Sequence, residues 1–318
     1  METNILTSSH APDEFLGASS VLVFIVYMWT CYDKTSIRLD PYSCGKHAKH
    51  IRLRYNALID RLTRTHGEDR GEQEEMKFVS WNIRHGGTKK KLEAICNQLK
   101  IWNPDVVGLS EFRESGTSQA IAESLREMGL IHQLTTVDSP ERGRNFLLLA
   151  SRYPAETQPA NGILASSGRW LHAKIEAMDV MLTHVPNRSA EKWQFHDEVV
   201  ARFAELKDCP AICFGDTNTG KPNLDDETNF FNGQEAEWFQ RINDAGWVDV
   251  WRQRNPEGRE YTWYSHQGNG FRLDQLFVSH EFADSISNVQ HDWGDGGRDA
   301  KLSDHAAITF EIGKPGAR

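Results

Sequence analysis

The sequence predicts an α/β fold in which two mixed β-sheets carry helices on their outer sides. Short apolar runs, typical of strands, alternate with longer amphipathic segments, typical of helices. After about residue 140 the predicted strands often follow one another without a helix between them, which argues against a purely parallel, doubly wound sheet. A chain of 318 residues with 39% hydrophobic residues is long enough to bury one large core and to carry an appendage.

Eight strands and two helices follow from these patterns. Apolar side chains at helical spacing predict one helix around Leu92, Ile95 and Leu99 and a second between 193 and 206. Short apolar runs predict strands at 78–81, 106–110, 146–151, 170–177, 180–184, 211–215, 272–279 and 306–312.

The chain divides near Met76 into an N-terminal extension, 1–75, and a folded domain, 76–318. Residues 15–32 carry no charge and are just long enough to span a thin bilayer. Acidic residues precede this stretch and basic residues follow it, which would place the folded domain in the cytoplasm, either free or anchored. The alternative is that 1–75, including the charged linker at 61–75, is not part of the native protein.

Composition limits the classes of function. The net charge of −9 leaves only a weak basic footprint for nucleic-acid binding, although bound divalent cations can reverse the local field around a phosphodiester. The five cysteines include no Cys-x-x-Cys pair, so no zinc ligand set is visible. No protein partner is predicted.

Polar side chains stand where the predicted strands begin or end. Each has an ordinary explanation as a turn or solvated residue, but catalytic groups are often presented at such positions, and together they predict a site. They are Asn82, Glu111, His184, Asp216 with Asn218, Asp274, and Asp304 with His305.

The segments that carry these residues resemble the metal-dependent endonuclease/exonuclease/phosphatase superfamily, which includes deoxyribonuclease I and exonuclease III. The resemblance rests on Ser80-Trp81-Asn82-Ile83, on 104–111, on Gly215-Asp216-Thr217-Asn218, on Arg272-Leu273-Asp274 and on Ser303-Asp304-His305. It covers residues 78 to about 312 and implies a four-layer α/β sandwich, with two mixed sheets packed face to face and helices outside.

The resemblance implies roles for these residues. Asn82 and Glu111, with Asp304 assisting, would bind Mg²⁺ or Mn²⁺ through oxygen ligands. Asp216, held by Asn218, would orient or deprotonate the attacking water. His305, paired with Asp274, would stabilise charge on the phosphate.

Other residues distinguish branches of this superfamily. His184 resembles the deoxyribonuclease I branch, where an imidazole assists the leaving oxygen, whereas Asn187 resembles a phosphate contact of the apurinic endonucleases. Trp263 is a candidate for stacking on a base or sugar, with burial in the core as its alternative. Asn269 is a candidate substrate contact, and Arg272 is either a phosphate ligand or part of a structural ion pair.

These observations predict a Mg²⁺- or Mn²⁺-dependent phosphoesterase that hydrolyses a phosphodiester by in-line attack of water, with DNA or RNA favoured. The first alternative is a lipid or small-molecule phosphoesterase similar to inositol phosphatases or sphingomyelinases, which suits the acidic balance and the candidate anchor at 15–32. The second is a non-catalytic binding module on the same fold. Such modules usually lose a metal ligand or the Asp-x-Asn pair, and this chain retains both.

Overall fold

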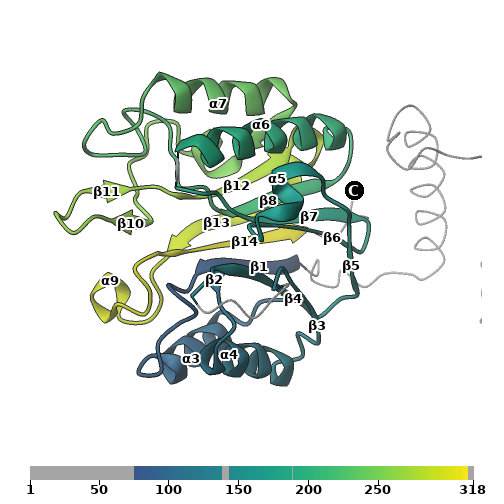
Figure 1. The fold of residues 1–318 in the computed structure, drawn as a ribbon, viewed down its shortest axis with the longest axis vertical. Helices are drawn as coiled ribbons and strands as arrows, with labels where there is room; N and C mark the ends of the chain where they lie inside the picture. Colours follow the sequence, from purple (N-terminus) through teal and green to yellow (C-terminus); the bar gives the residue numbers. More distant parts are fainter. Residues whose placement is uncertain (1–74, 138–142, 188, 314–318) are drawn as a thin grey trace, which may run out of the picture. The chain divides into compact units, whose positions relative to one another are not determined.

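The computed structural model describes residues 75–137, 143–187 and 189–313. The predicted extension and the candidate membrane span at 15–32 lie outside these ranges. Within them, no helix is both long enough and apolar enough to cross a membrane. The described residues form two six-stranded sheets packed face to face, with helices on both outer sides (Figure 1).

The first sheet has the strand order β13-β14-β1-β2-β4-β3. Strands β1 and β2 run parallel, and the other described neighbours in this sheet are antiparallel. The strands are β1 Glu75–Asn82, β2 Val106–Phe112, β3 His132–Thr135, β4 Phe146–Ser151, β13 Ile286–Asp292 and β14 Ala307–Gly313.

The second sheet has the strand order β5-β6-β7-β8-β12-β9. Here β7 and β8 run parallel, while the other described neighbours are antiparallel. The strands are β5 Ala155–Thr157, β6 Trp170–Ile175, β7 Met178–His184, β8 Ala211–Asp216, β9 Trp247–Asp249 and β12 Asp274–Ser279. Both sheets are therefore mixed, as the sequence predicts.

The inner faces of the sheets share one apolar core. Phe78 stacks on Phe310 of the same sheet with ring centroids 4.9 Å apart, and Phe214 of the other sheet meets Phe78 edge-on at 6.1 Å. Each fully buried ring of this size contributes roughly 1.5–3 kcal/mol. Gly108 permits the close approach, because a Cβ added there would lie 2.5 Å from the Phe214 ring.

Helices cover the outer faces and complete four layers, so the predicted sandwich is confirmed (Figure 1). The first sheet packs against α3 Leu92–Trp102 and α4 Gly116–Glu127 through an outer cluster that includes Leu99 and Leu125. The second packs against α6 Ser189–Leu206 and α7 Gly233–Asp244 through a cluster that includes Phe203 and Trp238.

The eight strands and two helices predicted from the sequence are all present, with ends that differ by a few residues. The predicted strand at 170–177 ends at Ile175, because the chain turns at Glu176 with a positive φ of 52°. The elements that sequence patterns missed include several short ones, which bury too few side chains to show a period. These short elements are α5 Gly162–Ser166, α8 Val250–Arg254, α9 Gly297–Ala300, the 3₁₀ helix η1 His280–Ser285, and the hairpin of β10 Trp263–Tyr264 and β11 Gly270–Phe271.

Candidate active site

The topology brings the predicted polar residues to one end of both sheets. Asn82 ends β1 and Glu111 lies near the end of the parallel strand β2, while His184 and Asp216 end the parallel strands β7 and β8. Strands β12 and β14 run antiparallel to these neighbours, so Asp274 at the start of β12 and His305 just before β14 reach the same end.

Asp216 joins the two sheets through Asn82. The Asn82 side chain donates from Nδ2 to Asp216 Oδ2 at 3.0 Å, and the same Nδ2 lies 3.4 Å from Glu111 Oε1. Asn82 and Asp216 are both buried. The contact therefore fixes the end of the first sheet against the end of the second.

The backbone leading into the Asp216–Asn218 turn requires glycine at position 215. Gly215 has a φ of 137°, and a Cβ there would lie 2.0 Å from the Thr183 carbonyl oxygen, so only glycine fits. Asn218, with a φ of 47°, donates its backbone N–H to Asp216 Oδ1 at 2.9 Å. Its side chain instead donates to the Val185 carbonyl oxygen at 2.7 Å. Asn218 thus holds Asp216 through the main chain, and its amide ties the turn to the end of β7.

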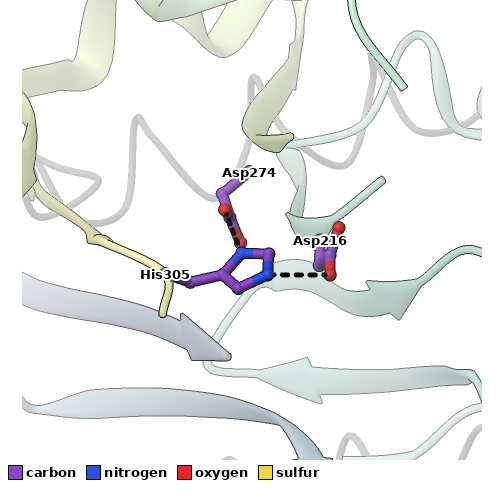
Figure 2. Close-up of side chains that lie close together, drawn as sticks. All are labelled: Asp216, Asp274 and His305. Atoms are coloured by element: carbon purple, nitrogen blue, oxygen red, sulfur yellow. Dashed lines mark hydrogen bonds and ion pairs between the residues drawn. The ribbon is translucent and has the colours of Figure 1, made fainter. Parts of the chain in front are cut away.

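His305 lies between two carboxylates (Figure 2). Its Nδ1 is 2.8 Å from Asp274 Oδ2, and its Nε2 is 3.9 Å from Asp216 Oδ2. Burial by itself would lower the pKa of His305, but the charges of Asp274 and Asp216 outweigh it and raise that pKa to about 10. Burial also raises the pKa of Asp216 to about 7, against the opposing effect of the His305 charge.

Asp216, Asp274 and His305 offer ligand-type atoms within 4.8 Å of one another, a spacing that suits a metal ion. Nδ1 of His305, however, is within hydrogen-bond distance of Asp274, and the charges of the two carboxylates raise the pKa of the ring to about 10, which favours the imidazolium, a form with no free lone pair for a metal. We therefore interpret this group as a carboxylate–imidazolium–carboxylate chain, and the metal ligand set as the separate one predicted from the sequence.

Glu111, one of the three predicted metal ligands, has a carboxylate that a backbone hydrogen bond holds in place. It has a φ of 56° at an irregularity in the β2–β4 pairing, which turns its side chain away from the regular strand direction. The His85 backbone N–H donates to Glu111 Oε2 at 2.7 Å. The carboxylate is thus held in place while remaining partly exposed.

The loop that follows β1 contacts Asn82 and Asp304 as well as Glu111. The Ser303 hydroxyl donates to the Asn82 carbonyl oxygen at 2.6 Å, and Arg84 Nε lies 3.2 Å from Asp304 Oδ2. Two carboxylates and an amide oxygen are hard ligands of the kind that Mg²⁺ and Mn²⁺ require, so these residues fit such an ion. In the present orientation Asn82 Oδ1 accepts the Arg84 N–H at 2.9 Å, which leaves one lone pair of that oxygen for a cation.

His184 is buried at the end of β7. Its Nε2 lies 3.6 Å from Asp216 Oδ2, and its Nδ1 lies 3.2 Å from Nη1 of Arg169. Sequence reasoning identified His184 but missed Arg169, because no motif marks an arginine just before β6. The two consecutive strands predicted at 170–177 and 180–184 were the one sequence signal that could have placed Arg169 beside His184, because strands joined by a short connection pair antiparallel.

The predicted substrate contacts differ in their surroundings. Trp263 forms a β-bridge with His305, and their rings lie 6.4 Å apart. Asn187 is exposed two residues beyond Val185, whose N–H donates to the Asp216 carbonyl oxygen. Asn269 lies in the β10–β11 turn, where its carbonyl oxygen accepts the Ser265 N–H. Trp263 is thus the one of these three for which a side-chain approach to a catalytic candidate is seen.

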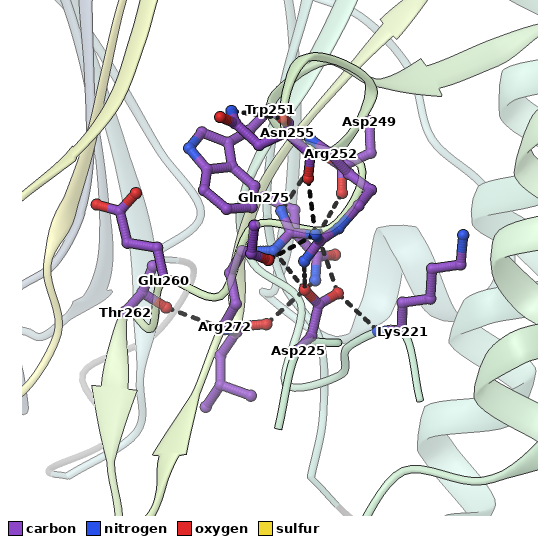
Figure 3. A network of polar contacts seen from close by, with 12 residues as sticks. Lys221, Asp225, Asp249, Trp251, Arg252, Asn255, Glu260, Thr262, Arg272 and Gln275 are labelled. Atoms are coloured by element: carbon purple, nitrogen blue, oxygen red, sulfur yellow. Dashed lines mark hydrogen bonds and ion pairs between the residues drawn. The ribbon is translucent and has the colours of Figure 1, made fainter. Parts of the chain in front are cut away.

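Arg272 is not a phosphate contact, and that prediction is wrong. The side chain is fully buried, with 0% of its surface exposed, and its guanidinium lies between Asp225 and Asp249 (Figure 3). Nε is 2.8 Å from Asp225 Oδ1, and Nη2 is 2.9 Å from Asp225 Oδ2. Arg252 pairs with Asp225 as well. The structural ion pair, which the sequence left open as the alternative, is what the fold contains.

Two mixed sheets packed face to face, with helices outside and a site of carboxylates and imidazoles at their common end, define the class of this protein. The chain belongs to the Endonuclease/Exonuclease/phosphatase family, whose sequence model matches residues 79–305.

Named relatives are nucleases. An apurinic or apyrimidinic site endonuclease of Dictyostelium discoideum is 26% identical over 69% of this chain and 66% of its own length, so the chain spans just under two thirds of that relative. Exodeoxyribonuclease III of Haemophilus influenzae is 24% identical over 67% of this chain and 91% of its own length. An exodeoxyribonuclease of Bacillus subtilis is 28% identical over 74% of this chain and 99% of its own length.

Solved structures share the fold. An AP endonuclease from Archaeoglobus fulgidus superposes with a TM-score of 0.63 at 21% identity, covering 74% of this chain and 99% of that one. A 3′ phosphatase from Neisseria bound to a product DNA hairpin gives a TM-score of 0.62 at 24% identity, with the same coverage.

Proposed function

We propose that this protein is a Mg²⁺- or Mn²⁺-dependent phosphodiesterase that hydrolyses a nucleic acid by in-line attack of water. The observation that carries the proposal is the environment of Asp216. One buried carboxylate, whose pKa burial raises to about 7, faces Asn82, His184 and His305 at the common end of both sheets. A base with a pKa near the working pH is the most effective acceptor for the proton of a water.

The roles of the remaining residues follow from their geometry. Asn82, Glu111 and Asp304 would hold the divalent cation, which when bound supplies charge stabilisation to a phosphoryl oxygen. His305, fixed by Asp274, presents a charged Nε2–H toward the region beside Asp216. A positioned cationic donor of this kind stabilises the negative charge that develops on the phosphoryl group.

The immediate surroundings of the site favour a polyanionic substrate despite the net charge of −9. Arg84 is 55% exposed beside Asp304, and Arg169 lies beside His184. Burial lowers the pKa of Lys91, and the nearby Arg84 lowers it further while Asp304 raises it, so this lysine belongs to the same edge. A phosphate group beside Arg84 and Lys91 would relieve the repulsion between these two cations.

A base or sugar next to the scissile phosphate could stack on Trp263, which lies beside His305. We propose Asn187 and Asn269 as additional contacts from the two loops at this end. The names of the relatives, which are DNA endonucleases and exodeoxyribonucleases, support a nucleic acid over a lipid.

The test is hydrolysis by the full chain with Mg²⁺ or Mn²⁺, using supercoiled plasmid, single-stranded DNA, RNA, an abasic-site duplex and a phosphoinositide. Asp216→Asn should lower turnover by at least about 100-fold without loss of folded protein. The matched control is Asp208→Asn, the same exchange at an exposed position. Full activity of Asp216→Asn would contradict its role, and cleavage of the phosphoinositide alone would assign the protein to the lipid phosphoesterases.

A further inference from the structure

Arg169 and His184 are tied together at both main chain and side chain. The His184 N–H donates to the Arg169 carbonyl oxygen at 2.9 Å. In return, Arg169 Nη1 lies 3.4 Å from the His184 carbonyl oxygen and 3.2 Å from Nδ1 of the ring. The guanidinium is therefore held in register with the imidazole by the pairing of adjacent strands β6 and β7.

This contact determines which ring nitrogen carries the proton. A guanidinium has only hydrogen-bond donors, so Nδ1 of His184 must act as the acceptor. The single proton of a neutral imidazole is then on Nε2. Full burial lowers the pKa of His184 well below its ordinary value, and the charges of Arg169, His305 and His85 lower it further, which agrees with a neutral ring.

Nε2 points toward the centre of the proposed site. It lies 3.6 Å from Asp216 Oδ2, beyond direct hydrogen-bond distance and close enough for a shared third group. An oxygen of water or of a phosphoryl group placed there could accept from His184 while it contacts Asp216.

We propose that Arg169 is a positioning residue that fixes His184 as the neutral Nε2–H tautomer, so that His184 donates a hydrogen bond to the substrate and does not act as a base. The proposal rests on the proposed function, in which substrate phosphate lies beside Asp216. It divides the work among three side chains. Asp216 accepts the proton of water, His305 supplies a charged donor, and His184 supplies a neutral donor.

The contact with Arg169 prevents His184 from acting as a base. A neutral ring with Nδ1 bound to arginine has no free lone pair for a proton from water, and it gives up its Nε2 proton only at very high pH. Four charged or titratable groups among the described residues face the ring. They are Arg169 just before β6, Asp216 at the end of β8, His305 just before β14, and His85 in the loop after β1. Arg169 is a cation whose Nη1 lies 3.2 Å from Nδ1, so a second proton on His184 is opposed.

The proposal is tested by nitrogen-15 NMR of histidine-labelled full chain, without metal and without substrate, with His184 assigned by the loss of its signals in His184→Asn. We expect the pattern of a neutral ring protonated on Nε2 throughout pH 6–8. Arg169→Leu should give mixed tautomers and a His184 pKa higher than in the wild type, because the charge of Arg169 is removed, but still below the ordinary value, because the ring stays buried. Arg169→Lys, which also only donates, should keep the wild-type pattern. Arg144→Leu removes a neighbouring cation that hydrogen-bonds Ser166 and Ser167, and it should also leave the pattern unchanged.

A proton on Nδ1 in the wild type, a charged ring at neutral pH, or an unchanged tautomer in folded Arg169→Leu would each overturn the proposal. Turnover supplies the second measurement. His184→Ala should lose about 100- to 1000-fold in kcat, the usual effect of removing one such donor, and Arg169→Leu should lose less and be largely restored in Arg169→Lys. Because the tautomer is read without substrate, the absence of hydrolysis on every phosphoester would contradict the proposed function and not the role of Arg169.

Discussion

Asp274 Oδ2 and His305 Nδ1 lie 2.8 Å apart although they belong to different sheets. Asp274 begins β12 in one sheet, and His305 stands directly before β14 in the other. Asn82 and Asp216 make a second such link at 3.0 Å. The catalytic candidates are thus assembled by the packing of the two sheets, and any change that shifts one sheet against the other should affect activity before it affects secondary structure.

Replacing Glu111 with Gln should weaken metal binding, because a carboxylate is exchanged for a neutral amide. Groups that merely support metal ligands typically contribute about 10- to 100-fold in affinity, so loss of a ligand should cost at least that much. The measurement is the Mn²⁺ concentration that gives half-maximal hydrolysis, with calorimetric Mn²⁺ binding beside it. Glu123→Gln on the exposed face of α4 is the control, and an unchanged Mn²⁺ requirement in Glu111→Gln would remove Glu111 from the ligand set.

Replacing Arg272 with Met should destabilise the fold by about 3–5 kcal/mol, because it leaves buried carboxylates of Asp225 and Asp249 without their shared cation. Arg272→Lys should recover only part of this loss, since lysine lacks the planar fork that contacts both partners. Urea unfolding measures the effect. A phosphate contact would behave differently, raising KM while leaving stability unchanged.

Lys192 of α6 links the Asp216–Asn218 turn to α7, and Lys192→Met should both destabilise the fold and lower activity. Its Nζ lies 3.2 Å from the Asn218 carbonyl oxygen and 3.2 Å from Glu235 Oε1. Removing the cation leaves the Glu235 carboxylate buried, at a cost of about 3–5 kcal/mol.

The double variant Lys192→Met with Glu235→Gln separates the two effects of Lys192. It removes both charges and should recover most of the stability but not the activity. Equal recovery of both would show that Lys192 acts on stability alone. Lys207→Met, at an exposed position, is the control.

His196 should make the fold sensitive to acid. It is buried against Trp238, with ring centroids 4.0 Å apart, and neither ring nitrogen has a hydrogen-bond partner among the described residues. Burial, then the charges of Lys192 and Arg241, hold its pKa well below the ordinary 6.5. As pH falls below about 6.5, the unfolded chain takes up a proton that the folded chain refuses, and stability drops by about 1.4 kcal/mol per pH unit.

His196→Phe should therefore make the decline in unfolding free energy between pH 7 and pH 5 shallower. The ring can still stack on Trp238 but no longer titrates. Exposed His266→Gln serves as the control, and identical acid profiles for wild type and His196→Phe would rule out His196 as the source.

The sequence by itself determined the longer elements and most of the residues at the site. Buried strands such as β2 and β8 show as continuous apolar runs, and the polar residue that ends each run is visible as a change in character. Asn82, Glu111, His184, Asp216, Asp274 and His305 could be named for this reason. The sequence also predicted two mixed sheets, because consecutive strands without intervening helices argue against a purely parallel sheet, whose neighbouring strands need a longer crossover connection.

Only the tertiary structure decided how those residues pair and which neighbours tune them. Arg169 is 15 positions from His184 and belongs to no motif, yet antiparallel pairing places its guanidinium beside Nδ1 of the His184 ring. Arg272 stands beside the motif residue Asp274, yet it points into a buried pair of carboxylates. Side-chain direction and burial depend on which strands and loops pack together, and a linear pattern records residue type and spacing but not those contacts across the fold.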